Sequence, residues 1–392
     1  MNTKTQIGIG VVGCGHRMAA LLPHIPGLGG NIEIRRLADP DPLAIQEFQA
    51  DIAPRAKASA DAAQLAADPA VDWVFVGSPN ALHPEHAIVA LEAGKDVFCE
   101  KPLATTVDDA LRIRQAHQAS GRTLALGFVL RYTRHGQALR RIIDSGVLGN
   151  ILSLEFNETL PLDHGGHIHG NAWRRLTSIG GGHMLEKCSH DIDLISWLLD
   201  ARPVRVASFG GLRLFTADNA NHAERIGQHE SGRPAFQGWG LRRDGDPFAM
   251  KKDIVDHQVA ILEFDNQARA TFHTHCATAI PERRLYLCGD RGTLRADFNT
   301  GLIEVEPLGY NTTREQIDTN DEGGHGGGDR ILGESLAETM LRGQTPLASV
   351  KEGIVATAVA LAIDQARTNS QVVDLTPLWQ QIDETSPHST SV

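Results

Sequence analysis

Two short stretches of this sequence carry side chains that can exchange protons, and they lie far apart in the chain. In the first, Lys101 stands between an acidic residue and a proline in Glu100-Lys101-Pro102. Its ammonium group can donate to a substrate hydroxyl, and burial with cationic neighbours would lower its pKa towards the working range. In the second, Glu186 and His190 have the i, i+4 spacing that puts a carboxylate and an imidazole on one helix face. We therefore predict acid–base chemistry on a hydroxyl group, with Glu186 orienting His190.

A glycine turn near the start of the chain indicates a dinucleotide site. Gly13-Cys14-Gly15 follows an apolar run and precedes a helix that we expect to begin at His16. Backbone N–H groups and the helix N-terminus can then face a pyrophosphate, and we take His16 and Arg17 as further cofactor contacts. Met18 stands where the usual fingerprint has a third small residue, so the helix and strand must pack closely in another way.

An acidic residue at the end of the second expected strand bears on the choice of nucleotide. Asp39 lies at the distance from the glycine turn where a carboxylate reaches the adenosine ribose hydroxyls. Its charge would repel a 2′-phosphate, and no Arg or Lys follows it closely, so we predict NAD rather than NADP. The alternative is that Asp39 only opens the turn before Pro40.

Polar residues also follow the third expected strand. Ser78-Pro79-Asn80 and His83 would lie near the middle of a cofactor rather than at its adenine end. We take Ser78, Asn80 and His83, together with Glu100 and Lys101, as candidate cofactor contacts. The alternative for Asn80 is helix capping, in which it would satisfy local backbone groups.

The elements that position these residues change type along the chain. Strands are expected over residues 7–12, 32–38, 71–76, 96–99 and 123–128, with helices over 16–25, 42–49, 83–93 and 106–120. This β–α alternation predicts a parallel sheet in a first domain of residues 1–128. Beyond Arg131 we expect a helix over 137–145 and strands over 151–158, 204–214, 255–264, 268–276, 283–289 and 292–297. Consecutive hairpins suggest an antiparallel sheet in a second domain of residues 129–380.

The second half contains one strand and two irregular segments that bear on function. Residues 268–275 alternate small or apolar residues with polar or larger ones, which indicates a strand with one wetted face that is an interface or a site. Segments 162–171 and 216–252 resist regular assignment, and long loops of this kind are usually functional. Helices are expected over 332–342 and 353–368, and residues 381–392 are expected to form a disordered tail.

Composition limits the partners and the compartment. A chain of 392 residues exceeds one ordinary core and fits two domains. Its net charge of -11 argues against nucleic acid, whose binders carry clustered Lys and Arg. Five irregularly spaced cysteines fit reduced thiols, and neither a signal peptide nor an apolar run of transmembrane length is apparent. We expect a cytoplasmic protein without nucleic-acid or membrane partners.

Taken together, Gly13-x-Gly15, Ala38-Asp39, Ser78-Pro79-Asn80, Glu100-Lys101-Pro102 and Glu186-x-Cys188-x-His190 resemble the Gfo/Idh/MocA oxidoreductases, the family of glucose–fructose oxidoreductase and inositol dehydrogenases. The resemblance covers nearly the whole chain, and Glu-Lys-Pro is its most specific motif. It implies an α/β fold: an N-terminal Rossmann domain with a doubly wound parallel sheet, and a C-terminal α/β domain with an open, mostly antiparallel sheet. It also implies carbohydrate substrates, with Lys101 as the catalytic lysine and His190 exchanging the substrate hydroxyl proton.

The substrate side departs from the family pattern. The family usually has Asp-x-Gly-x-His where this chain has Glu186 to His190, so the carboxylate is one methylene longer and the glycine is absent. Arg174 falls where such proteins often place a substrate-contacting arginine. Arg175 doubles the positive charge there, which would favour an acidic or strongly hydrogen-bonding sugar. His167 and His325 are further candidates for a polar substrate pocket, and exposed loop histidines are the alternative.

The leading hypothesis is reversible NAD-dependent oxidation of a secondary alcohol in a sugar, sugar acid or polyol. Some relatives instead keep NAD bound and cleave glycosidic bonds through transient oxidation, and a third possibility is a non-catalytic sugar or dinucleotide sensor. No metal is expected, because Glu186, Cys188 and His190 lack the spacing of a closed zinc site. The resemblance and the wetted sheet face suggest a homodimer or homotetramer formed through the C-terminal sheet.

Overall fold

The computed structural model describes residues 6–230, 232–237 and 245–384 of the chain. These residues form two compact units, and each unit contains several separate segments of the chain. Unit 1 comprises residues up to Ala138, Ser178–Gly181 and Asn320–Thr357, and unit 2 comprises Leu139–Thr177, Gly182–Thr319 and the chain from Ala358. None of the described helices is both long and apolar enough to cross a membrane.

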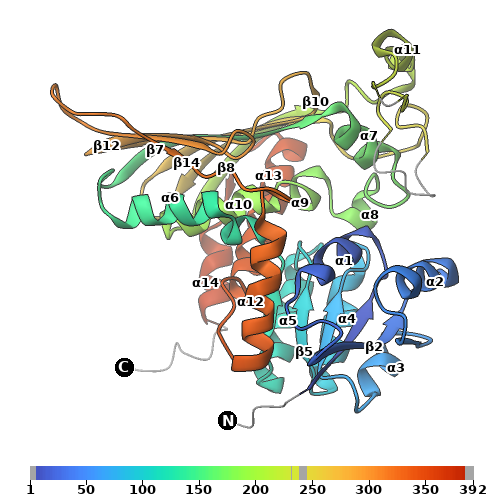
Figure 1. The fold of residues 1–392 in the computed structure, drawn as a ribbon. Coiled ribbons are helices and arrows are strands. Elements are labelled where there is room, and N and C mark those ends of the chain that lie inside the picture. The colour runs from blue at the N-terminus through green and yellow to red at the C-terminus, as the bar shows by residue number, and fades with distance from the viewer. Residues whose placement is uncertain (1–5, 231, 238–244, 385–392) are drawn as a thin grey trace. The chain divides into compact units, whose positions relative to one another are not determined.

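Unit 1 is built on a six-stranded sheet in the order β3-β2-β1-β4-β5-β6 (Figure 1). Its strand pairs are parallel. The strands are β1 (Ile7–Val12), β2 (Ile32–Ala38), β3 (Lys57–Ala58), β4 (Trp73–Val76), β5 (Asp96–Cys99) and β6 (Leu124–Leu126). This strand order is the doubly wound arrangement that the sequence predicts, and ligands of such sheets bind outside the carboxyl ends of the strands.

Three helices of this N-terminal region begin just after a polar side chain that caps them: Asp41, Asp61 and Thr106. The helices of the region are α1 (His16–Leu21), η1 (Leu22–His24), α2 (Pro42–Asp51), α3 (Ala62–Ala67), η2 (Asn80–Leu82), α4 (His83–Glu92), α5 (Val107–Ser120) and η3 (Val129–Tyr132). Thr106 caps α5 by accepting from the backbone N–H of Asp109, and Gly121 ends it in the left-handed conformation. Both ends of α5 are as predicted, whereas β3 and α3 were not predicted.

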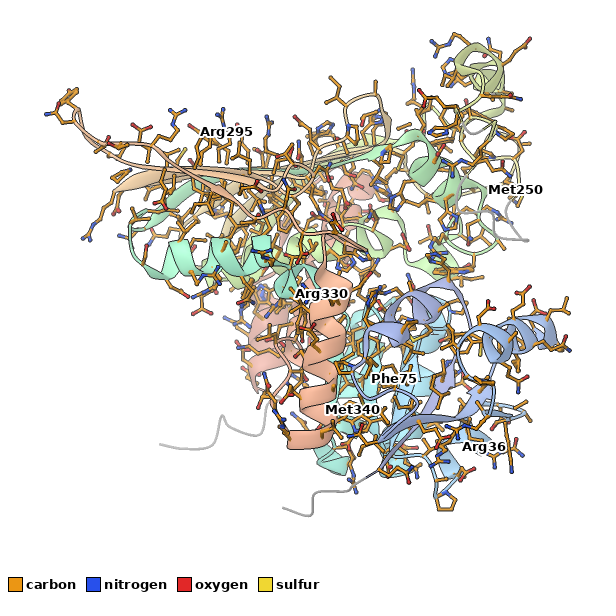
Figure 2. The ribbon with its side chains drawn as sticks, viewed as in Figure 1. Arg36, Phe75, Met250, Arg295, Arg330 and Met340 are labelled. Carbon is orange, nitrogen blue, oxygen red and sulfur yellow. The ribbon has the colours of Figure 1, made fainter. Side chains whose placement is uncertain are left out.

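The core of unit 1 is completed by a helix from late in the chain. Leu332, Leu336 and Met340 of α12 (Gly328–Arg342) share one apolar cluster with Phe75 on β4, and Figure 2 labels Phe75 and Met340. The units therefore differ from the expected domains 1–128 and 129–380, because residues 320–357 pack into unit 1. The apolar spacing along α12 predicts an amphipathic helix but not which sheet it covers.

Unit 2 contains a nine-stranded sheet in the order β14-β13-β12-β11-β7-β10-β9-β8-β15. The strands are β7 (Ile151–Pro161), β8 (Pro203–Gly211), β9 (His257–Phe264), β10 (Arg269–Thr278), β11 (Arg284–Gly289), β12 (Gly292–Asp297), β13 (Leu302–Pro307), β14 (Glu315–Asp318) and β15 (Val373–Asp374). Strands β7 and β10 pair in parallel, and the other pairs among the described residues are antiparallel. The prediction of a mostly antiparallel second sheet is confirmed.

The two faces of this sheet have different surroundings. Helix α10 (Ser189–Leu199) contacts β7 and lies along one face (Figure 1). On the other face, Phe209 and Ile261 are 71% and 59% exposed. Strand β10 alternates buried residues such as Phe272 with exposed ones such as His273, which confirms the predicted wetted face.

The remaining helices include several that we did not expect. They are α6 (Arg134–Asp144), α7 (Leu162–Gly170), α8 (Thr177–Gly180), α9 (His183–Glu186), η4 (Ala217–Asn219), α11 (Asn221–Ile226), α13 (Val350–Asn369) and α14 (Thr376–Glu384). The prediction of an irregular segment over 162–171 is wrong, because α7 occupies it. Its glycines weaken helix propensity but allow close packing, since a Cβ on Gly165 would lie 1.5 Å from the Cys276 carbonyl oxygen.

Two further expectations concern the segment over 216–252 and the C-terminal tail. The segment contains the short helices η4 and α11, and residues 231 and 238–244 lie outside the described residues. Residues 381–384 of the expected tail belong to α14, because Trp379 and Ile382 are buried and hold that helix in place. Residues 385–392, the rest of that expectation, are outside the described part of the chain.

Candidate functional site

The glycine turn after β1 has the geometry that a pyrophosphate site requires. Gly13 has a φ of +89°, and a Cβ there would lie 2.6 Å from the backbone of Gly77 and Ser78. Gly15 is exposed before α1, and apart from its two chain neighbours no residue has an atom within 4 Å of the position a Cβ would take. The backbone at Gly15 is therefore open to a ligand, as a bound dinucleotide needs. His16, the first residue of α1, is also exposed.

The packing beneath this turn explains the unusual Met18. Met18 is fully buried, and a Cβ on Gly77 would lie 2.7 Å from its Cγ. The small residue that close packing requires is therefore Gly77, after β4, rather than position 18. Nothing in the sequence indicates that Gly77 compensates for Met18.

Asp39 forms a hydrogen bond to the backbone of the glycine turn. Its Oδ2 accepts a hydrogen bond from the backbone N–H of Cys14 at 2.9 Å, and its Oδ1 accepts from that of Asp41 at 2.8 Å. The second contact is the turn role that we kept as the alternative. Burial, and then the negative charge of Asp39, raise the pKa of the Cys14 thiol to about 12, so this thiol is neutral.

The backbone around Lys101, just after β5, is fixed on both sides. On one side the buried Glu100 accepts the Lys101 N–H through Oε2 at 3.1 Å. On the other, the buried His83 lies with Nδ1 2.7 Å from the Pro102 carbonyl oxygen and Nε2 2.9 Å from that of Ser78. His83 therefore links the segments that follow β4 and β5. The Lys101–Pro102 peptide bond is cis.

Ser78 and Asn80 have partners on different elements. Ser78 Oγ lies 2.9 Å from His86 Nδ1 on α4. The buried Asn80 donates through Nδ2 to the Gly180 carbonyl oxygen at 2.8 Å. Asn80 thus bonds a backbone group distant in the chain, where the alternative predicted a local one.

Arg17 and His325, which we expected at the cofactor and the substrate, take part in one ion network in unit 1. Arg17 donates to Glu100 Oε1 and to Asp329 Oδ1, both at 2.6 Å. His325 Nδ1 lies 3.0 Å from the other oxygen of Asp329. Asp329 could not be found from the sequence, since nothing near it in the chain points to Arg17.

In unit 2, Glu186 and His190 do not share one regular helix. Glu186 is the last residue of α9, and α10 begins at Ser189 after a break at Cys188, which has a ψ of 0°. Both side chains are buried. Glu186 Oε1 forms an ion pair with Arg174 Nε at 3.0 Å. An arginine is therefore a partner of the carboxylate that we expected to orient His190.

The neighbouring arginines and His167 are also held in place. The Arg174 guanidinium lies 4.2 Å from the ring centre of Trp173. Arg175 donates to the Lys251 carbonyl oxygen at 2.9 Å. His167, on α7, is buried. Because Glu186 balances the charge of Arg174, the positive charge that we expected to select an acidic sugar is reduced.

A cluster of four buried charges adjoins His190 in the sequence. Arg283 donates to both oxygens of Asp191 at 2.8 Å and to Glu158 at 3.1 Å, and Lys187 lies 3.0 Å from Glu158. Burial opposes ionisation of Glu158, but the charges of Arg283 and Lys187 lower its pKa to about 2. This cluster could not be found from the sequence, because its members come from β7, the link between α9 and α10, α10 itself and the approach to β11.

Part of this cluster has metal-like spacing. Among the described residues, one ligand atom each from Glu158, Cys188 and Asp191 lie within 4.8 Å of one another. Burial raises the pKa of the Cys188 thiol well above its usual range. The two carboxylates of this group are already paired with cations of the protein itself.

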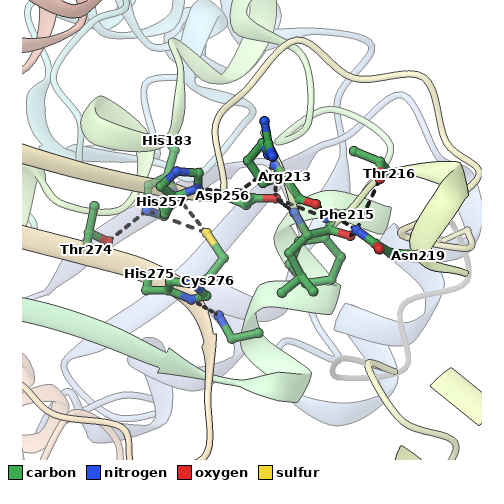
Figure 3. A network of polar contacts seen from close by, with 12 residues as sticks. His183, Arg213, Phe215, Thr216, Asn219, Asp256, His257, Thr274, His275 and Cys276 are labelled. Atoms are coloured by element: carbon green, nitrogen blue, oxygen red, sulfur yellow. Dashed lines mark hydrogen bonds and ion pairs between the residues drawn. The ribbon is translucent and has the colours of Figure 1, made fainter. Parts of the chain in front are cut away.

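Asp256, just before β9, anchors the segment that follows β8 (Figure 3). Its carboxylate accepts the backbone N–H groups of Arg213, Leu214 and Phe215 at 2.6 to 3.1 Å, and its Oδ1 lies 2.8 Å from His257 Nδ1. Nearby, His183 Nε2 lies 3.0 Å from Thr274 Oγ1. Burial lowers the pKa of His183 to about 4, so its imidazole is neutral near pH 7.

The fold and the glycine turn define a dinucleotide-binding α/β protein, and comparison with known families gives its class. The model of the oxidoreductase family with an NAD-binding Rossmann fold matches residues 7–128, and that of the GFO/IDH/MocA C-terminal domain matches residues 137–295. The chain therefore belongs to the Gfo/Idh/MocA oxidoreductase family. The Rossmann domain of this family binds NAD. The resemblance and the NAD prediction are confirmed.

Individual relatives match over part or all of the chain. A 1-carboxy-3-chloro-3,4-dihydroxycyclohexa-1,5-diene dehydrogenase from Comamonas testosteroni is 32% identical over 52% of this chain and 50% of its own length. An inositol 2-dehydrogenase from Agrobacterium fabrum is 33% identical over 50% and 54%. This chain thus spans about half the length of these two relatives. A levoglucosan dehydrogenase, solved with NADH and levoglucosan, superposes with a TM-score of 0.77 at 19% identity over 95% of this chain and 100% of its own, which shows a shared fold.

Proposed function

We propose that this protein transfers a hydride between NAD and a secondary alcohol of a sugar, sugar acid or polyol. One observation carries the proposal: the open glycine turn and the Glu100-Lys101-Pro102 segment follow strands of one parallel sheet, β1 and β5, within unit 1. Ligands of doubly wound sheets bind at these strand ends. Relatives named for oxidation of inositol and levoglucosan support a carbohydrate substrate.

Each part of the chain has a role in this proposal. Gly13 and Gly15 leave room for the pyrophosphate, and we assign Asp39 to the adenosine ribose. NAD held at the glycine turn would supply the hydride acceptor for oxidation of the substrate's carbinol carbon. Lys101 donates a hydrogen bond to the substrate hydroxyl and eases loss of its proton, which His190 accepts as the ketone forms. Glu186, Arg174, Arg175 and His167 are the further residues that we assign to the substrate side.

The decisive experiment is a substrate screen. The protein and NAD are mixed in turn with neutral sugars, uronic acids, inositols and aryl glycosides. NADH absorbance and aglycone release are measured in each mixture. Net NADH from one of these alcohols is expected. Aglycone release without net NADH would favour cleavage through transient oxidation, and binding without turnover would favour a sensor.

A variant pair tests the residue roles. Lys101→Met is expected to lower kcat by about 100-fold or more while NAD still binds, because general acid–base groups contribute on that order. His190→Asn is expected to lower kcat similarly. Turnover unchanged in both variants would exclude these roles.

We also propose that two or four copies associate through the open face of the nine-stranded sheet. Phe209, Val259 and Ile261 leave an apolar surface there, and such surfaces mark protein interfaces. Light scattering should show a dimer or tetramer, and Ile261→Glu should dissociate it. Ile280→Glu, at an exposed position outside the strands, is the matched control and should leave the assembly intact.

The compartment is a further proposal. All five cysteines are free thiols, and four of them are buried. Reduced thiols fit a reducing compartment, so we propose that the protein is cytoplasmic. Fractionation of cells that produce the untagged protein tests this.

A further inference from the structure

Arg17 joins three segments of unit 1 that are distant in the chain. It stands on α1 just after the glycine turn, and its Nε and Nη1 donate to Glu100 Oε1 and Asp329 Oδ1, each at 2.6 Å. The two carboxylates are 8% and 5% exposed, against 22% for Arg17. Short charge-assisted bonds to buried carboxylates are strong and directional. The guanidinium is therefore held between two fixed acceptors.

The carboxylate of Glu100 connects Arg17 to the backbone of Lys101. One oxygen receives Arg17, and the other receives the backbone N–H of Lys101 at 3.1 Å. A Cβ on Gly127 would lie 2.8 Å from that second oxygen, so the glycine leaves the space that the carboxylate occupies. The position of Glu100 thus fixes the main chain at Lys101 from one side, and His83 fixes Pro102 from the other.

Asp329 holds Arg17 from the opposite direction. It lies in the first turn of α12, where the helix dipole favours a negative charge. Its second oxygen lies 3.0 Å from His325 Nδ1, and His325 has a φ of +51°, which is unfavourable for a residue other than glycine. A strained backbone position that persists because its side chain is bonded indicates a functional constraint. Burial opposes ionisation of Asp329, but His325 and Arg17 hold its pKa well below the usual range.

We propose that Arg17 is a positioning residue for Lys101: through Glu100 it holds the Lys101 backbone, and Asp329 keeps Arg17 in place. The inference rests on the proposed function, in which Lys101 acts on the substrate hydroxyl. It replaces our expectation that Arg17 is simply a cofactor contact, since both carboxylate partners belong to the protein itself.

The first test reads the environment of Lys101 without turnover. Lysines of the full-length protein are methylated with ¹³C-formaldehyde under reducing conditions, and the Lys101 dimethylamine signal is assigned by its loss in Lys101→Arg. Arg17→Gln is expected to shift this signal and its pH titration. Arg36→Gln, which breaks the Arg36–Asp68 ion pair in the same unit, is the matched control and should leave the signal unchanged. An unmoved Lys101 signal in Arg17→Gln would overturn the proposal.

The second test separates positioning from cofactor binding. Arg17→Gln should lower kcat by about 100-fold, the order expected when a catalytic group is misplaced, with the Kd of NAD changed by less than about threefold. A loss of NAD affinity with kcat unchanged would make Arg17 a cofactor ligand and overturn the proposal. If the wild type oxidises no carbohydrate, the proposed function fails, and the Lys101 signal still decides the positioning role. Asp329→Asn, which keeps the side-chain shape, provides both measurements if Arg17→Gln does not fold.

Discussion

Arg174 Nε lies 3.0 Å from Glu186 Oε1, so a carboxylate and an arginine that we expected to act separately on the substrate neutralise each other. The pair is mostly buried, and the guanidinium also stacks on Trp173. Any preference for an acidic sugar therefore depends on how completely Glu186 balances Arg174.

This pairing makes substrate charge preference adjustable. Glu186→Gln should free the charge of Arg174 and raise the ratio of kcat/KM for a uronic acid to that for its neutral parent by about tenfold, which corresponds to 1.4 kcal/mol. The ratio cancels any general loss of activity. Arg174→Met combined with Glu186→Gln is the control and should return the ratio to the wild-type value. A ratio that stays constant in all three proteins would contradict the prediction.

Asp39 should determine the choice between NAD and NADP. Asp39→Ser removes the charge that repels a 2′-phosphate and the acceptor of the Cys14 N–H. We expect the NAD to NADP affinity ratio, measured by calorimetry, to fall by about 10- to 100-fold, or 1.4 to 2.8 kcal/mol. Asp61→Ser removes an aspartate that caps α3 and should leave the ratio unchanged. Equal ratios in wild type and Asp39→Ser would leave Asp39 as a turn residue only.

The buried ion cluster in unit 2 should matter far more to stability than an exposed pair on the same sheet. The side chain of Arg283 is 10% exposed and binds Asp191 and Glu158, whereas Arg295, labelled on the sheet in Figure 2, is 57% exposed and binds Glu304. Arg283→Met leaves two buried carboxylates short of a partner and should cost about 3 to 5 kcal/mol of unfolding free energy. Arg295→Met should cost at most about 1 kcal/mol. Urea denaturation of both variants checks the contrast, and similar losses would refute it.

His183 should make the fold sensitive to acid over a defined range. Burial lowers its pKa from 6.5 to about 4, so between these pH values the unfolded chain takes up a proton that the folded chain refuses. Its contribution to stability is therefore lost as the pH falls from about 6.5 to about 4, by at most about 1.4 kcal/mol per pH unit. His183→Gln should flatten the dependence of the unfolding free energy on pH over this range.

A hydroxyl variant controls for this effect. Thr274→Val removes the group 3.0 Å from His183 Nε2 but keeps the imidazole. It should lower stability at every pH without flattening the curve. If His183→Gln and wild type lose stability in parallel between pH 6.5 and 4, the acid sensitivity has another origin.

Sequence patterns predicted the parts of the fold that depend on neighbours in the chain. The strands at 7–12, 32–38 and 96–99 have the bounds expected from their apolar runs, and α5 lies within one residue of its predicted range 106–120. Helix α7 was not predicted, because its glycines are typical of a loop. Their close contact with Cys276 explains why they occur in a helix. Local propensity cannot report such long-range packing.

The same limit applies to the site. The glycine turn, Asp39 and Lys101 could be located because each follows a strand, and strand ends are visible in the sequence. The partners of Arg17 and Arg283 could not, because they come from strands and helices far along the chain. A charge on a helix predicts an ion pair, but tertiary packing decides with which residue.

Because residues 320–357 belong to unit 1, they limit how hybrids between this protein and a relative can be built. A hybrid that took its nucleotide-binding half from a relative by exchange of the N-terminal segment alone would pair that sheet with the α12 of the other parent. Leu332, Leu336 and Met340 would then pack against core residues of the other parent. Asp329 would face whichever residue that parent has at position 17. We therefore expect cofactor preference to be transferred without loss of stability only when the two segments are exchanged together.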